Sequence, residues 1–252
     1  TYGKSRVESS QPAAGTQTEL TLRVPGTPAL PDEWPARLLA RAARDDIEPG
    51  HYLVLDNPRG TLSGFVFVTD PVLGVVDGPT GLIRFTYAVG VNGDDVEQML
   101  SWDPLKFAAF VGDRVPLGLT STDRAPISAD PQDRALLEEA VGSEGASIGA
   151  MHARYLEVDA EGRVDLDPTA ARALLRAARH RLLHGRSFAL LNGETWLLLN
   201  PQSPTTECAS DHIVVPATAA FAHELLATFD TVPGIYRLRT APLELRVVDP
   251  TT

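Results

Sequence analysis

Cysteine is almost absent from this chain of 252 residues, in which Cys208 is the single example. A framework of intramolecular disulfides is therefore excluded, and this cysteine usage is typical of a reducing compartment. Long apolar runs are absent as well. No run approaches the ~18 apolar residues that a membrane span needs, and no charged-then-apolar leader opens the chain. We therefore expect a cytoplasmic protein that neither spans a membrane nor is exported.

Positive charge is also scarce, with 22 Lys and Arg residues against 33 Asp and Glu residues and a formal net charge of −11. Binding to phosphate needs a surface rich in Lys and Arg, so nucleic acid is not expected as a direct partner. Basic protein surfaces fit this charge better. The length allows one large domain or two small ones, and 43% hydrophobic residues suffice for ordinary cores.

The familiar catalytic motifs are missing. Gly74, Gly78 and Gly81 lack the G-x-G-x-x-G spacing of a dinucleotide-binding turn, and there is no Walker loop. The segment 60–64, with sequence GTLSG, places its serine one position too late for a nucleophile elbow. We therefore expect a protein that is not an enzyme and has no catalytic residues, bound metal or cofactor.

Two pairs of residues keep an enzymatic alternative open. His180 and His184 are four residues apart and could face one metal from a helix, although neighbouring arginines would repel a divalent cation. A helix C-terminus that favours positive charge is the structural alternative. Cys208 and His212 lie with two carboxylates in the one mixed cluster of the chain. A hydrolase or metal-dependent enzyme using either pair is the alternative function, and a homo-oligomeric scaffold is another.

The stretch from Leu62 to Val91 has the strongest pattern in the first half. Apolar residues alternate from Ile83 to Val91, which predicts a strand with one buried face. Phe65 to Val68 is apolar throughout, which predicts a central strand. Other expected elements are strands at Glu19–Val24, His51–Leu55 and Val115–Leu119, a helix capped by Asp32, and helices at Asp94–Leu100 and Asp103–Val111.

The second half predicts a separate mixed domain. Residues 121–150 are polar and contain proline, so we expect a linker there with one helix at Pro131–Val141. A strand at His152–Val158 and a second at Arg163–Leu166 predict a hairpin, and Asn192-Gly193 predicts a type I′ hairpin. The predicted class is α+β, with two mixed α/β-sheet domains at 1–120 and 151–252 joined by the linker.

Three sequence blocks resemble the Suppressor of fused (SUFU) family and occur in the same order. Thr18–Val24 followed by Trp34–Leu38 resembles the family's "FELTFR…WPAELM". Thr69-Asp70-Pro71 with Val89-Gly90-Val91 resembles "TEDP…FLQIVGV". Arg181–Phe188 is similar to "GRLLHGRHF" and is the most specific block. The resemblance covers almost the whole chain and implies two α+β domains that meet at a cleft.

The same resemblance implies a function without catalysis. Animal members bind GLI transcription factors by gripping an extended peptide between strands of the two domains. The Ala-, Arg- and Pro-rich version here resembles bacterial members, which are thought to be immunity proteins that neutralise toxins. The partner is then a protein or extended peptide, such as a toxin with a basic surface. The implied partner-binding residues, for each of which a core role is the alternative, are His51, Tyr52, Arg154, Tyr155, Leu156 and Glu157.

Overall fold

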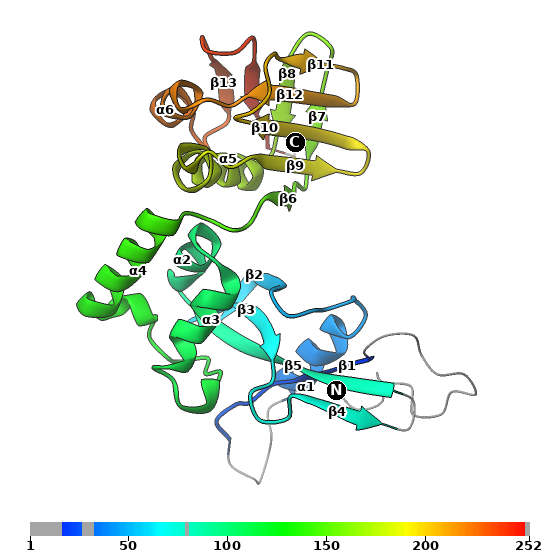
Figure 1. Cartoon of the computed structure of the whole chain (residues 1–252), viewed down its shortest axis with the longest axis vertical. Coiled ribbons are helices and arrows are strands. Elements are labelled where there is room, and N and C mark those ends of the chain that lie inside the picture. The colour runs from blue at the N-terminus through cyan, green and yellow to red at the C-terminus, as the bar shows by residue number, and fades with distance from the viewer. Residues whose placement is uncertain (1–16, 27–32, 79–80, 250–252) are drawn as a thin grey trace. The chain divides into compact units, whose positions relative to one another are not determined.

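The computed structural model describes residues 17–26, 33–78 and 81–249, which form two compact units that each combine helices with strands (Figure 1). Unit 1 runs up to Met99 and continues over Asp103–Leu137, whereas unit 2 takes Leu100–Trp102 together with the chain from Glu138 onward. The predicted α+β class is confirmed. No helix in these described ranges is long and apolar enough to cross a membrane.

The sheet of unit 1 has the strand order β1-β5-β3-β2. β4 pairs with the first residues of β5, Gly81 to Arg84. β1 is parallel to β5, and the other pairs are antiparallel. The predicted strands at Phe65–Val68 and Ile83–Val91 are confirmed as parts of β3 and β5. The bounds are β1 Gln17–Thr21, β2 Tyr52–Arg59, β3 Leu62–Thr69, β4 Val75–Gly78 and β5 Gly81–Asn92.

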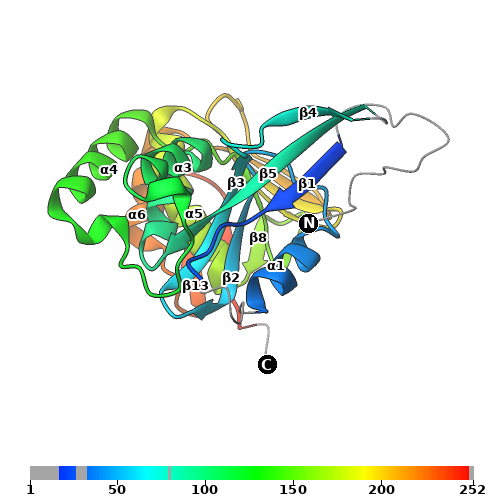
Figure 2. The same ribbon diagram turned by 90° about the horizontal axis from the view of Figure 1, so that it is seen from below.

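Helices α1 (Trp34–Ala42) and α3 (Pro104–Gly112) cover opposite faces of this sheet (Figure 2). Phe65 and Phe67 of β3 are buried in one cluster with Ala42 of α1. Since side chains alternate along a strand, the residues between them point to the other face, which α3 covers. α3 starts as expected, because the Asp103 carboxylate accepts a hydrogen bond from the Lys106 amide.

The strand predicted at Val115–Leu119 is wrong, because these residues form the 3₁₀ turn η1 (Pro116–Gly118). Pro116 cannot donate to a ladder, and positive φ angles of 56° at Leu117 and 62° at Gly118 turn the chain away from an extended path. Asp32, the predicted cap of α1, lies outside the described residues. The remaining elements of this stretch are α2 Asp95–Ser101, η2 Ile127–Ala129 and α4 Pro131–Glu144, the last of which lies in the predicted linker.

A buried carboxylate ties β1 to the end of β3 in unit 1. Asp70 is 1% exposed and accepts hydrogen bonds from Thr21 Oγ1 at 2.7 Å and from Arg23 Nη2 at 2.6 Å. The backbone amides of Val72 and Leu73 donate to the same carboxylate at 2.9 and 3.0 Å. Burial raises the pKa of Asp70, but these hydrogen bonds together outweigh it and lower the pKa to about 2. Asp70 is therefore charged and structural.

Unit 2 contains two sheets that share one core with the helices α5 and α6. One sheet has the order β11-β12-β10-β9-β6, and the other has the order β13-β14-β8-β7. Its helical elements are α5 Pro168–His180, η3 Leu182–His184 and α6 Ala219–Thr228. Its strands are β6 Ala150–His152, β7 Leu156–Val158, β8 Arg163–Leu166, β9 Phe188–Asn192, β10 Thr195–Asn200, β11 Glu207–Cys208, β12 His212–Pro216, β13 Gly234–Arg237 and β14 Glu244–Val247.

The single strand predicted at His152–Val158 is wrong, because the stretch supplies two strands to two different sheets. β6 pairs with β9, whereas β7 pairs with β8 in the predicted hairpin, which is confirmed. The break follows from Asp167, whose Oδ2 accepts hydrogen bonds from the Arg154 and Tyr155 amides at 3.0 and 3.1 Å. These two amides are drawn to the carboxylate and leave the strand ladder.

The hairpin predicted around Asn192-Gly193 is confirmed, but its turn type is wrong. Asn192 pairs with Thr195, so the tip consists of Gly193 and Glu194. A type I′ turn needs positive φ at both tip residues. Here φ is 58° at Gly193, and Leu117 is the one non-glycine residue with positive φ in the described part of the chain.

Candidate functional site

Asp167 positions the segment that carries several of the predicted partner-binding residues. Its Oδ1 accepts hydrogen bonds from the Thr169 and Ala170 amides at 2.7 and 3.1 Å, which caps α5. Its Oδ2 holds the Arg154 and Tyr155 amides. One buried side chain therefore fixes the start of α5 and the approach to β7 at the same time.

The neighbouring strands β7, β8 and β14 belong to the second sheet of unit 2, and their outer face is charged. Val164 and Leu166 of β8 and Leu245 and Val247 of β14 are buried, so the residues between them point outward. Asp165 lies directly opposite Glu157 of β7 on one side and Arg246 of β14 on the other. The alternation of buried and charged positions thus brings residues from three strands onto one surface.

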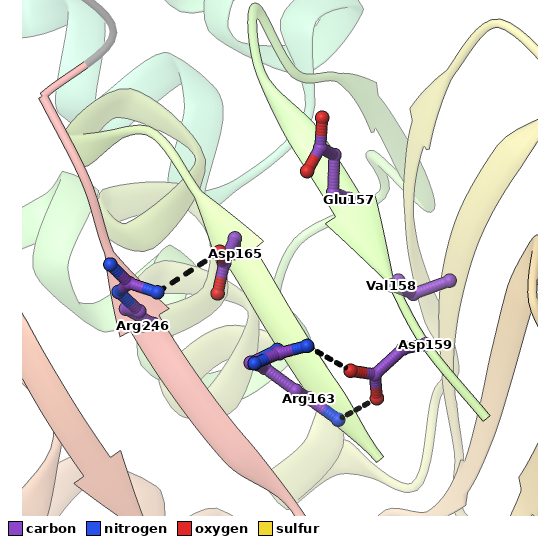
Figure 3. Close-up of a pocket in the computed structure, with 6 residues that line it drawn as sticks. All are labelled: Glu157, Val158, Asp159, Arg163, Asp165 and Arg246. Atoms are coloured by element: carbon purple, nitrogen blue, oxygen red, sulfur yellow. Dashed lines mark hydrogen bonds and ion pairs between the residues drawn. The ribbon is translucent and has the colours of Figure 1, made fainter. Parts of the chain in front are cut away.

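These residues line a cavity of about 280 Å³, which we call the β7 pocket (Figure 3). Arg163 binds Asp159 with its side-chain Nη2 at 2.6 Å and its backbone amide at 2.9 Å. Arg246 Nη1 lies 3.6 Å from Asp165 Oδ2, which is too long for a hydrogen bond. The residues of the pocket are Glu157, Val158, Asp159, Arg163, Asp165 and Arg246.

The carboxylates of the β7 pocket affect nearby ionisable groups. The Arg163 amide, followed by the Arg163 charge, holds the pKa of Asp159 below its usual value despite partial burial. Burial raises the pKa of Tyr155, and the Glu157 carboxylate beside it raises the pKa of Tyr155 further. At neutral pH Asp159 in the pocket is therefore charged, and Tyr155, which precedes β7 outside the pocket lining, is a neutral phenol.

The predicted partner-binding residues lie on, or directly before, an edge strand of each unit. In unit 1, Tyr52 begins β2, and His51, which is exposed, precedes it and accepts a hydrogen bond from the Phe67 amide at its carbonyl. In unit 2, Arg154 and Tyr155 precede β7, and Glu157 lies within it and lines the β7 pocket. β2 pairs with β3, and β7 with β8, and neither has a second neighbour among the described strands.

Leu156 differs from the other members of this group. Its side chain is 2% exposed and packs in the core of unit 2 with Val164 and Leu166 of the neighbouring strand. This position fits the packing role that was the alternative for each predicted residue. Since Leu156 and Glu157 point to opposite faces of the sheet, Glu157 is the residue of β7 that reaches the surface.

Cys208 and His212 occupy the neighbouring strands β11 and β12. The His212 ring stacks on Trp196 with centroids 4.4 Å apart, and its Nδ1 lies 2.8 Å from Asp211 Oδ1. Burial raises the pKa of the Cys208 thiol, and Asp159 raises the pKa of this thiol further. A nucleophilic cysteine needs a lowered pKa, so the surroundings of Cys208 disfavour the thiolate.

His180 ends α5, and His184 ends η3. The His184 ring packs against Gly145, where an added Cβ would lie 2.8 Å from its Cδ2 atom. Within the ranges that the structure describes, no group of three or more His, Cys, Asp or Glu side chains is placed to hold a metal ion.

Sequence reasoning missed Asp159, Arg163, Asp165 and Arg246. A signal was present, because R-V-D-L at 163–166 and E-L-R-V at 244–247 both alternate charged and apolar residues. The alternation predicts that Asp165 and Arg246 point to the same kind of face. It does not predict that β8 and β14, which are far apart in the sequence, are neighbours.

The fold defines a class of α+β proteins built from two units with mixed sheets. Among solved structures, the chain is similar to Drosophila Suppressor of Fused, with a TM-score of 0.67 and 18% identity over 92% of this chain and 77% of that chain. The chain therefore has the Suppressor of Fused fold, as the sequence resemblance implied. A structure described as the Sufu-Fu complex matches 54% of this chain and 69% of that chain at 24% identity, with a TM-score of 0.43. No family model and no curated protein matches.

Proposed function

We propose that this chain is a non-enzymatic protein-binding module that captures an extended segment of a partner protein on its edge strands. The observation that carries the proposal is the position of the candidate residues. Tyr52 lies on β2 and Glu157 on β7, and each strand is at the edge of its sheet in the described part of the chain. An edge strand offers backbone N–H and C=O groups that an added strand can pair with.

Side chains beside these edges supply specificity. Backbone pairing is largely independent of sequence, so the partner is selected by residues at alternate positions of the edge strands. In unit 2, Tyr155 and the exposed Glu157 are alternate positions, and the exposed Arg154 lies directly before them. In unit 1, Tyr52 begins the edge strand and the exposed His51 directly precedes it. The Suppressor of Fused fold of the chain supports this reading, since the sequence resemblance implies peptide capture for the same strands.

Within this proposal, the partner is a toxin with a basic surface, and the protein is a bacterial immunity protein that binds and neutralises the toxin. The net charge of −11 supports such a partner, because an acidic protein attracts and masks basic surfaces. The sequence resemblance supports the immunity role. An immunity protein of this kind acts by binding alone and uses no cofactor and no chemical step of its own.

The test is calorimetry of the purified full chain against toxins encoded beside it in its source genome. We expect saturable binding to one toxin and loss of that toxin's activity. Tyr52→Ala and Tyr155→Ala should each weaken binding about tenfold or more, which corresponds to ~1.4 kcal/mol. Glu194→Ala, an exposed change at the β9–β10 tip, is the control and should leave affinity unchanged.

Two outcomes contradict the proposal. Saturable turnover of an ester, peptide or nucleotide library that a single substitution at Cys208, His212, His180 or His184 abolishes would favour the enzymatic alternative. Light scattering that shows a stable homo-oligomer, together with no affinity for any candidate toxin, would favour the scaffold.

A further inference from the structure

We infer that the β7 pocket is a receptor for the guanidinium group of an arginine side chain presented by the partner. This inference rests on the proposed function and adds the chemistry that the partner must carry. The pocket contains three carboxylates and two guanidinium groups of its own. Its negative charge exceeds its positive charge by one, and the placement of each group shows where the missing cation fits.

Glu157 and Asp165 are directly opposite each other on the antiparallel strands β7 and β8. Side chains in such a pair have Cβ atoms about 4.5–5.5 Å apart, and two like charges there destabilise the sheet. A cation placed between the two carboxylates converts this repulsion into two attractions. Glu157 is exposed, so a cation from solvent can reach it directly.

Asp165 has an unused hydrogen-bonding atom. Its Oδ1 is buried and has no hydrogen-bond partner among the described residues. A buried acceptor without a donor is unfavourable, and a donor from the partner would remove this unfavourable state. The other oxygen, Oδ2, faces Arg246 at 3.6 Å, so it also lacks a short hydrogen bond.

The pocket's own cations do not complete the site. Arg163 is committed to Asp159 through two hydrogen bonds. Arg246 is the more weakly held of the two pocket arginines, because its contact with Asp165 is long and its side chain is 46% exposed. Because this contact is long and exposed, Arg246 gives up its place beside Asp165 Oδ2 to the incoming guanidinium, which then donates to the Asp165 carboxylate.

Guanidinium fits this arrangement better than ammonium. Its five N–H donors lie in one plane and can bind Glu157 and Asp165 at the same time, whereas an ammonium is a compact point charge. A strand added beside β7 also places alternate side chains on the outer face, next to Glu157. The partner segment therefore carries an arginine at the position that aligns with Glu157.

The test uses acetyl-arginine-N-methylamide as the probe and nuclear magnetic resonance of the labelled full chain. We expect saturable shifts of the amides of 155–158 and 163–166. Acetyl-citrulline-N-methylamide, which has the same shape without charge, should give no saturable shift. The lysine analogue should bind at least about threefold more weakly. Glu157→Gln and Asp165→Asn should each raise the Kd about tenfold, as expected for a lost charge-assisted hydrogen bond.

Glu194→Gln is the matched control, because it removes one exposed carboxylate outside the pocket, and it should leave the Kd unchanged. Thermal melts of all variants check that they fold. Equal binding of citrulline and arginine, equal binding of lysine and arginine, or full binding by the double variant E157Q/D165N would each overturn the inference. A toxin that binds the full chain while the arginine probe shifts no pocket amide would leave the proposed function standing and reject the arginine receptor.

Discussion

Asp70 shows how a single buried charge makes unit 1 sensitive to acid. Its pKa is about 2 in the folded chain, below the ordinary value of 3.8. A carboxyl with a lowered pKa contributes stability that is fully present above its unfolded pKa and is lost as the pH falls toward its folded pKa. The window is therefore about pH 4 to pH 2. With 1.36 kcal/mol for each pKa unit, the contribution is about 2 kcal/mol.

We predict that Asp70→Asn lowers the unfolding free energy of unit 1 at pH 7 by about 2 kcal/mol and removes this part of the acid sensitivity. The amide keeps the shape but loses the charge that Arg23 faces at 2.6 Å. Urea unfolding at steps between pH 2 and pH 5 measures both effects. An equal loss of stability with acid in the variant and the original chain would show that Asp70 is not responsible.

Leu156 separates a packing role from a binding role. Because its side chain is 2% exposed in the core of unit 2, Leu156→Ala should lower the unfolding free energy by about 2–5 kcal/mol. Circular dichroism melting measures the change, beside a binding assay with the partner. The neighbouring Glu157→Ala should leave the melt almost unchanged, since Glu157 is exposed. An unchanged melt for Leu156→Ala with weakened binding would instead assign Leu156 to the partner surface.

At the scale of elements, two glycines of unit 2 should respond in opposite directions to the same substitution. A Cβ added at Gly142 in α4 or at Gly193 in the β9–β10 tip would meet no atom within 4 Å. Gly142→Ala should stabilise the helix by up to about 1 kcal/mol. Gly193→Ala should destabilise the hairpin by about 1 kcal/mol, because φ is 58° there. Thermal melts test the pair, and a shared sign would contradict the φ argument.

Local patterns predicted most elements, but not their neighbours. The period-2 alternation at Ile83–Val91 and the Asp103 cap were sufficient for β5 and the start of α3. The division of His152–Val158 into β6 and β7 depends on hydrogen bonds from the Arg154 and Tyr155 amides to Asp167, a residue more than ten positions away. No local pattern contains such a contact.

Only part of the candidate site could be predicted, because local patterns do not show which distant segments become neighbours. The sequence resemblance pointed to Tyr155 and Glu157, of which Glu157 lies on β7 and Tyr155 directly precedes that strand. Asp165 and Arg246 become neighbours only through the parallel pairing of β8 with β14. Strand pairing between distant segments is decided by the packing of the whole core, and a single sequence shows little of it.

At the scale of the whole molecule, charge should control how fast a basic partner arrives. With a net charge of −11, long-range attraction accelerates the encounter at low ionic strength, and salt screens it over about 10 Å at 0.1 M. We predict that the association rate constant falls about tenfold or more between 10 and 150 mM salt, while the dissociation rate changes much less. Stopped-flow mixing measures both. A salt-independent association rate would contradict a basic partner surface.

Trp102 belongs to unit 2 although its neighbours in sequence, from Asp103 to Leu137, belong to unit 1. Its Nε1 donates to Glu144 Oε2 at 2.6 Å, and its carbonyl accepts from the Ser147 amide at 2.7 Å. Trp102 is synthesised before the rest of unit 1 is complete, whereas Glu144 and Ser147 are added only after it. The indole N–H and the carbonyl of Trp102 therefore gain these two partners only when the first part of unit 2 that follows unit 1 has been made.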